Sequence, residues 1–115
     1  DAGCVINAGP GNIVFPTTVG TATKPVDQIS SAKVVCTDTT PYKLYFTSTN
    51  NPGGTTFSMK NGTKSIPYSI ASGATLIGTT NAAALSQTGN GGEQTIPLTF
   101  SPMKVMNSPT PTAKL

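Results

Sequence analysis

Cys4 and Cys36 are the residues of this chain whose type and spacing best support a defined chemical role. They form an even pair without CxxC spacing, in a chain that has no histidine and four acidic residues. This pattern fits a structural disulfide better than a metal or redox centre. Two buried free thiols or one reactive thiol are the alternatives, and a reactive thiol would need a lysine to lower its pKa. A disulfide predicts an oxidising compartment and stabilises a small domain by roughly 3–4 kcal/mol.

Catalytic groups are not expected in this sequence. Without histidine, Ser-His-Asp and Cys-His arrangements cannot form, and the four acids stand apart rather than as a carboxylate pair. The glycine-rich residues 9–11 and 89–92 lack the Lys-Thr helix start of a phosphate loop, and they are typical of turns. The chain is therefore predicted not to be an enzyme and to need no metal and no cofactor.

The charge pattern argues against nucleic acid as a partner. The net charge of +3 comes from seven lysines without any arginine, and these lysines are scattered singly along the chain. Nucleic-acid binding is not expected, because it uses arginine forks and clustered positive charge.

No apolar run reaches the length of a membrane span, and no basic-then-apolar leader is present. If the protein is exported, this chain is expected to be the mature form.

Length and composition indicate one all-β domain. The chain has 115 residues, of which 36% are hydrophobic, 10% are charged, 12 are glycine and 10 are proline. So much glycine and proline disfavours long amphipathic helices and favours short strands joined by turns.

Period-two alternation predicts three strands, at residues 28–37, 42–47 and 94–100, each with one apolar face. Residues 4–16 read as an edge strand with a kink at residues 9–11. The inward side chains are expected to be Ser30, Ala32, Val34 and Cys36, then Tyr42, Leu44 and Phe46, then Ile96, Leu98 and Phe100.

The dipeptide Asn61-Gly62 predicts a hairpin that joins residues 57–60 to residues 66–70, because both of its positions tolerate positive φ. Residues 71–92 are rich in small side chains, and they are expected to hold one short strand or helical turn. We expect a β-sandwich domain over residues 1–106, and a Pro/Thr-rich linker or tail outside the packed layers over residues 107–115.

The strand count, the turn spacing and one early disulfide together favour an immunoglobulin-like antiparallel β-sandwich. The chain departs from true immunoglobulin domains, because it has no tryptophan. Its cysteines also come too early to join the second and sixth strands of such a domain.

Apolar residues within loop-like sequence suggest a contact surface. Leu76 and Ile77 lie among glycines, and Ala83 and Leu85 belong to a second short apolar run. The alternative is that these side chains fill the end of the core.

Short motifs in a fixed order resemble a known family. They are Phe15-Pro16 after Cys4, Val34-Val35-Cys36, Pro41-Tyr42-Lys43-Leu44, Met59-Lys60-Asn61-Gly62 leading to Ile66-Pro67-Tyr68, and Thr88-Gly89 ahead of Gln94. This order resembles the spore coat U type domain of archaic, Csu-like chaperone–usher pili of Gram-negative bacteria. The resemblance implies an incomplete immunoglobulin-like fold, export through the periplasm, and a disulfide joining the first two strands. It also implies a periplasmic chaperone, an outer-membrane usher and neighbouring pilus subunits as partners, because a missing strand is supplied by strand addition.

Two departures from the family shape the functional prediction. Three residues precede Cys4, so this chain is not expected to donate a strand, and a final Gly-Tyr turn into a threonine- and valine-rich strand is absent. Both fit the surface-binding N-terminal domain of an extracellular pilus tip adhesin, acting in cell adhesion and biofilm formation. On this interpretation the domain contacts an abiotic or host surface through Leu76, Ile77, Ala83 and Leu85.

Two other functions stay open. A structural pilus subunit would have a groove lined by inward residues such as Val34, Leu44, Ile96, Leu98 and Phe100. A secreted carbohydrate-binding module would use the faces of Tyr42, Tyr45 and Tyr68 to stack on sugars.

Overall fold

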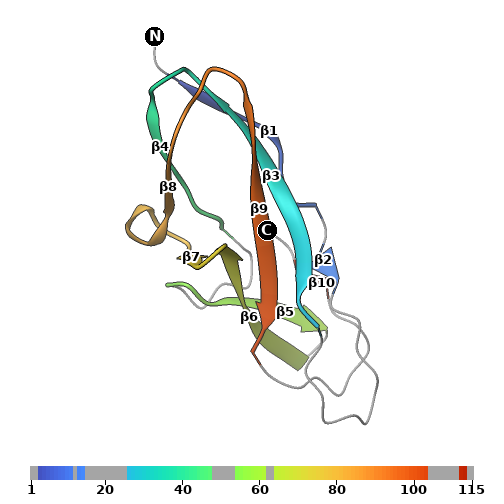
Figure 1. Ribbon diagram of the computed structural model, residues 1–115. Helices are drawn as coiled ribbons and strands as arrows, with labels where there is room; N and C mark the ends of the chain where they lie inside the picture. Colours follow the sequence, from blue (N-terminus) through green and yellow to red (C-terminus); the bar gives the residue numbers. More distant parts are fainter. Residues whose placement is uncertain are drawn as a thin grey trace.

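The computed structural model describes residues 3–11, 13–14, 26–47, 54–61, 64–103 and 112–113, and Figure 1 shows how their strands are arranged. The strands are antiparallel in every pairing among these residues. In chain order the elements are β1 (Cys4–Ala8), β2 (Ile13–Val14), β3 (Gln28–Cys36), β4 (Pro41–Leu44), β5 (Phe57–Asn61), β6 (Lys64–Ser72), β7 (Thr75–Ile77), the 3-10 turn η1 (Asn81–Ala83), β8 (Leu85–Thr88), β9 (Glu93–Pro102) and β10 (Thr112–Ala113).

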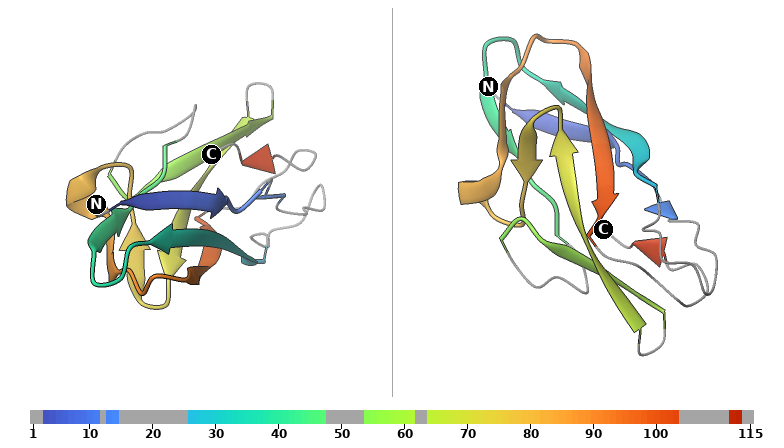
Figure 2. Two further views of the ribbon diagram at one scale, coloured as in Figure 1. Left: turned by 90° about the horizontal axis from the view of Figure 1, so that it is seen from above. Right: turned by 60° about the horizontal axis from the view of Figure 1, so that its bottom comes forward.

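Two sheets enclose the core. The larger sheet has the order β1-β3-β9-β6-β5-β10-β2, with β7 added beside β6, and the smaller sheet consists of β4 and β8. Figure 1 shows β3 and β9 running along the length of the molecule with β5 crossing its lower part, and the right-hand view of Figure 2 shows β6 rising from the lower end to lie beside β9. The predicted all-β, antiparallel class with an early disulfide is confirmed, and the architecture is consistent with an immunoglobulin-like sandwich.

The alternation that predicted β3 and β9 corresponds to their burial. On β3, Ala32, Val34 and Cys36 are buried while Lys33 is exposed. On β9 the buried residues are Ile96, Leu98, Phe100 and Pro102. The two strands pair over eight residue positions, from Gln28 opposite Phe100 to Val35 opposite Glu93.

Aromatic side chains fill the core beneath β6. The Tyr68 ring stacks on Phe57 with 5.6 Å between ring centroids and lies 6.2 Å from the ring of Phe100. All three residues are fully buried. Such ring pairs add to the free energy of area burial.

The expected hairpin is present with a different register from the Asn-Gly prediction. Asn61 is the last residue of β5 and pairs with Lys64, the first residue of β6. Gly62 and Thr63 therefore lie between the two strands, outside the described residues.

The predicted kinked first strand is two strands at opposite ends of the larger sheet. β1 pairs with β3 at one end of the strand order, whereas β2 pairs with β10 at the other end. The Gly9-Pro10-Gly11 break thus moves the chain from one edge to the other. The hydroxyl of Ser30 donates a 2.7 Å hydrogen bond to the carbonyl of Pro10, which ties this segment to β3.

The expectation that residues 107–115 lie outside the packed layers does not hold for Thr112 and Ala113. Thr112 pairs with Val14 and with Lys60, and Ala113 pairs with Ile13. Pro/Thr-rich composition concealed this strand, because a two-residue ladder leaves no periodicity to detect. The rest of the predicted tail, residues 107–111 and 114–115, lies outside the described residues.

Two turns are locked together at the disulfide end of the molecule. The backbone of Gly89 donates to the carbonyl of Thr40 and accepts from the amide of Thr39. A Cβ on Gly89 would lie 2.4 Å from the carbonyl oxygen of Thr37. Only glycine allows this approach of the β8–β9 connection to the β3–β4 turn.

Candidate functional site

The predicted disulfide is present and clamps β1 to β3. Cys4 and Cys36 are directly opposed in the ladder with their Cα atoms 4.1 Å apart, and their sulfurs are bonded. Cys36 is buried and Cys4 is exposed. The bond therefore joins an edge strand to the covered interior of the sandwich.

Because the ladder is antiparallel, the disulfide sets which side chains of β1 face inward. Ile6 pairs with Val34, two positions from the Cys4–Cys36 pair, so the two side chains lie on the same face of the sheet. Val34 is 1% exposed, yet Ile6 is 57% exposed. An inward-facing aliphatic side chain on β1 is thus uncovered, which means that the sandwich is open beside this strand.

An apolar cleft lies at this opening. Its volume is about 270 Å³, and it separates the β1 side of the larger sheet from the end of β4. Ile6 forms one wall, while Leu44 and Phe46 contribute apolar surface to the other wall. The described residues that line the cleft are Ile6, Gly9, Pro10, Leu44, Tyr45, Phe46 and Thr47.

Both strands beside this cleft have a free edge among the described pairings. β1 is the end strand of the larger sheet, and β4 pairs with β8 alone in the smaller sheet. A strand with a free edge offers backbone N–H and C=O groups to another strand. The cleft therefore combines apolar side chains with two available backbone edges.

The predicted surface-binding set is only partly exposed. Leu76 is 51% exposed and Ala83 is half-buried. Ile77 and Leu85 belong to the core, at 0% and 6% exposure, so their assignment as surface contacts is corrected. Ile77 pairs with Ile70 and Leu85 pairs with Leu44, which turns both side chains inward.

The groove expected from the inward strand residues is also largely filled. Val34, Ile96, Leu98 and Phe100 are each at most 5% exposed. Of the predicted groove residues, Leu44 lines the cleft described above. The opening lies at the β1 edge rather than along the middle of β3 and β9.

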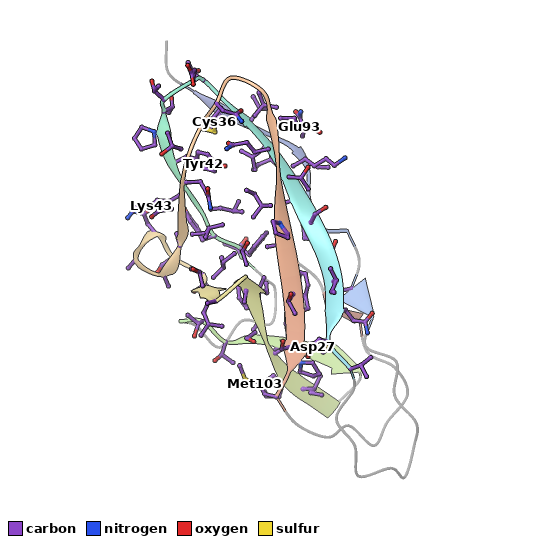
Figure 3. All side chains as sticks on the ribbon, in the orientation of Figure 1. Asp27, Cys36, Tyr42, Lys43, Glu93 and Met103 are labelled. Carbon is purple, nitrogen blue, oxygen red and sulfur yellow. A yellow bond between two sulfur atoms is a disulfide. The ribbon has the colours of Figure 1, made fainter. Side chains whose placement is uncertain are left out.

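The three tyrosines do not form one sugar-binding face. Tyr68 is fully buried, and Tyr45 is 45% exposed beside the cleft. Tyr42 faces the interior, where its hydroxyl makes a 3.0 Å hydrogen bond with Oε1 of Gln94 on β9. Figure 3 shows Tyr42 and Lys43 on opposite faces of β4.

The hydrogen bond from Tyr42 connects the two sheets. Gln94 accepts from Tyr42 and donates through Nε2 to the carbonyl of Thr88, so β4, β8 and β9 share one polar contact. Burial raises the pKa of the Tyr42 phenol above its ordinary value. The phenol therefore keeps its proton, and can donate, to higher pH than an ordinary tyrosine.

Sequence reasoning missed Ile6 as a candidate site residue. The signal was available once Cys4 and Cys36 were paired, because an antiparallel ladder then places Ile6 opposite Val34. The prediction of one kinked edge strand over residues 4–16 assigns no inward side chain to it.

The residues that the structure describes contain neither a metal-site cluster nor a membrane-spanning helix. Within that part of the chain, no three or more His, Cys, Asp or Glu side chains gather as a metal site would require. No helix of the described ranges is long and apolar enough to cross a membrane.

The family model of the Spore Coat Protein U domain, SCPU, matches residues 1–113. Comparison with curated proteins and with solved structures gave no significant match.

Proposed function

Because the chain belongs to the Spore Coat Protein U domain family, we propose that it is a pilus subunit whose β1–β4 cleft accepts an added β-strand. The family is found in chaperone–usher pilus systems, which supports an extracellular, pilus-related role. The observation that carries the finer proposal is the exposure of Ile6, an inward-facing residue of an edge strand.

An added strand would give the free backbone edges of the cleft hydrogen-bond partners and would also cover its apolar side chains. A strand between β1 and β4 pairs with the free backbone edges, and its alternate side chains cover Ile6, Leu44 and Phe46. Burying the exposed part of Ile6 alone contributes of the order of 1 kcal/mol, and each new backbone hydrogen bond adds to this. In the proposed assembly the strand comes first from a periplasmic chaperone and then from a neighbouring subunit, with an outer-membrane usher between the two steps.

A peptide-binding experiment tests this proposal. The purified, oxidised chain is mixed with a synthetic peptide of about ten residues that alternates valine and threonine, the length of a long strand. We expect Tm to rise with peptide concentration, because the peptide binds the folded state. Hydrogen exchange at the β1 amides should slow in parallel.

Matched controls locate the binding site. The same residues in a blocked order, without alternation, should bind much more weakly. Ile6→Asp should abolish the Tm rise, whereas Ile29→Asp should keep it, because Ile29 is 81% exposed on β3 and does not line the cleft. Protection of another edge, or an equal response of both variants, would show that the cleft is not a strand acceptor.

A surface-binding tip adhesin is the second candidate, and the exposure of Leu76 on β7 favours it. The predicted contact is then reduced to Leu76 and to half-buried Ala83 of η1. Leu76→Asp should lower retention on a polystyrene surface, while Val5→Asp, on exposed β1, should not. Unchanged retention of a folded Leu76→Asp variant would exclude this adhesive contact.

A further inference from the structure

A second hollow lies at the smaller sheet and has no part in the β1–β4 cleft. Its volume is about 560 Å³, within the range of ligand pockets. The described residues that line it are Pro41, Tyr42 and Lys43 of β4, Ser86, Gln87 and Thr88 of β8, and Asn81 of η1. Figure 3 shows the Lys43 side chain extending outward from β4.

The strand register places four of the lining side chains together. Lys43 is paired with Ser86, and Pro41 is paired with Thr88 two positions along the same face. All four residues are exposed, whereas the alternate residue Leu44 is buried in the core. A cation and two hydroxyls therefore share one outward face with the ring of Pro41.

The turn that carries Asn81 is held in place by short backbone contacts. The amide of Gly78 donates to the carbonyl of Ala83, and the amide of Ala83 donates to the carbonyl of Thr80 at 3.0 Å. A Cβ on Gly78 would lie 2.6 Å from the Cβ of Ala83, so the two backbone segments are in close contact. Asn81 is thus presented to the hollow by a fixed turn, which lowers the entropic cost of using it in binding.

The chemistry of this hollow selects an anionic, hydroxyl-rich ligand. Its described lining includes the Lys43 ammonium but no carboxylate. The hydroxyls of Ser86 and Thr88 and the amide of Asn81 can both donate and accept, which matches the two-way hydrogen bonding of sugar hydroxyls. A small inorganic anion would use Lys43 and leave most of the volume empty.

We propose that this hollow binds an acidic sugar residue of a glycan, such as a uronic acid. Its carboxylate pairs with Lys43, its hydroxyls bond to Asn81, Ser86 and Thr88, and a C–H face of its ring packs on Pro41. This binding is independent of strand addition, because the hollow and the cleft share no lining residue.

Titration of the oxidised chain with methyl glucuronide, observed by amide chemical shifts, tests the assignment. We expect saturable shifts at Lys43, Asn81, Ser86 and Thr88, and about tenfold weaker binding of methyl glucoside, which lacks the charge. Equal binding of the two sugars, or equal displacement by inorganic phosphate, overturns the proposal of an acidic sugar.

Two charge-removing variants complete the test. Lys43→Gln should weaken glucuronide binding by about tenfold or more, the usual effect of losing a hydrogen bond to a charged group. Lys33→Gln removes the same charge from the outer face of β3, where Lys33 lies 4.0 Å from Glu93, and should leave binding unchanged. Equal effects of the two variants would reveal a nonspecific charge effect and overturn the site. Both lysines are exposed, so both variants are expected to fold.

Discussion

Removal of the Cys4–Cys36 bond should lower the free energy of unfolding by an amount that follows from the chain length it closes. The sequence separation is 32 residues, and the loop-entropy relation then gives about 12 cal/mol/K, or about 3.7 kcal/mol at 25 °C. Cys4→Ser is the suitable change, because Cys4 is exposed and its hydroxyl replacement stays in water, whereas Cys36 lies in the core.

The assay is urea unfolding followed by far-ultraviolet circular dichroism, with and without a thiol reductant. Wild type should lose about 3–4 kcal/mol when reduced, equivalent to a fall in Tm of about 10–20 °C. Cys4→Ser should match reduced wild type and should not respond to reductant, which is the internal control. A loss below about 1 kcal/mol would refute the loop-entropy reasoning. So would a reductant response that persists in the variant.

The described contacts and side-chain exposures support four further predictions. Gly89→Ala should destabilise the fold by about 1–3 kcal/mol in thermal unfolding, because its Cβ would lie 2.4 Å from a backbone oxygen; Gly9→Ala, with open space around its Cβ position, is the control and should change little. Tyr42→Phe should cost about 1 kcal/mol at neutral pH, since a part-buried hydrogen bond is lost. The raised pKa of Tyr42 means that the native state holds its proton to higher pH than the unfolded chain, so stability should fall as pH rises above the ordinary tyrosine value; this fall should be smaller in Tyr42→Phe and retained in Tyr45→Phe. Leu76→Asp should change the free energy of unfolding by no more than about 0.5 kcal/mol, because the side chain is half exposed, and a larger loss would show that Leu76 packs in the core.

Long alternating runs made the central strands predictable. In β3 and β9 the inward positions recur every second residue over nine and ten residues, so chance patterns are unlikely to mimic them. The strand predicted at residues 42–47 ends at Leu44, but its expected inward side chains do face the core, with Leu44 buried and Tyr42 and Phe46 packed against it. The disulfide was predictable because two cysteines allow one pairing.

Short strands could not be assigned in the same way. β7 has three residues and β8 has four, so one apolar position on each cannot be distinguished from an exposed loop residue. The sequence therefore predicts Ile77 and Leu85 as surface contacts, whereas pairing with β6 and β4 turns them inward. The cleft at Ile6 depends on which strands lie at the sheet edges, and this is a property of topology that periodicity does not contain.

The position of the Cys4–Cys36 bridge also determines how the domain responds to mechanical load. Tension on the backbone ahead of Cys4 reaches the covalent bond before it reaches the hydrogen bonds of β1. The force therefore passes into β3, which is held along eight positions by β9, and β1 is not peeled away one residue at a time. A fibre built from such domains would keep its first strand seated under shear, even at the edge where the sandwich is open.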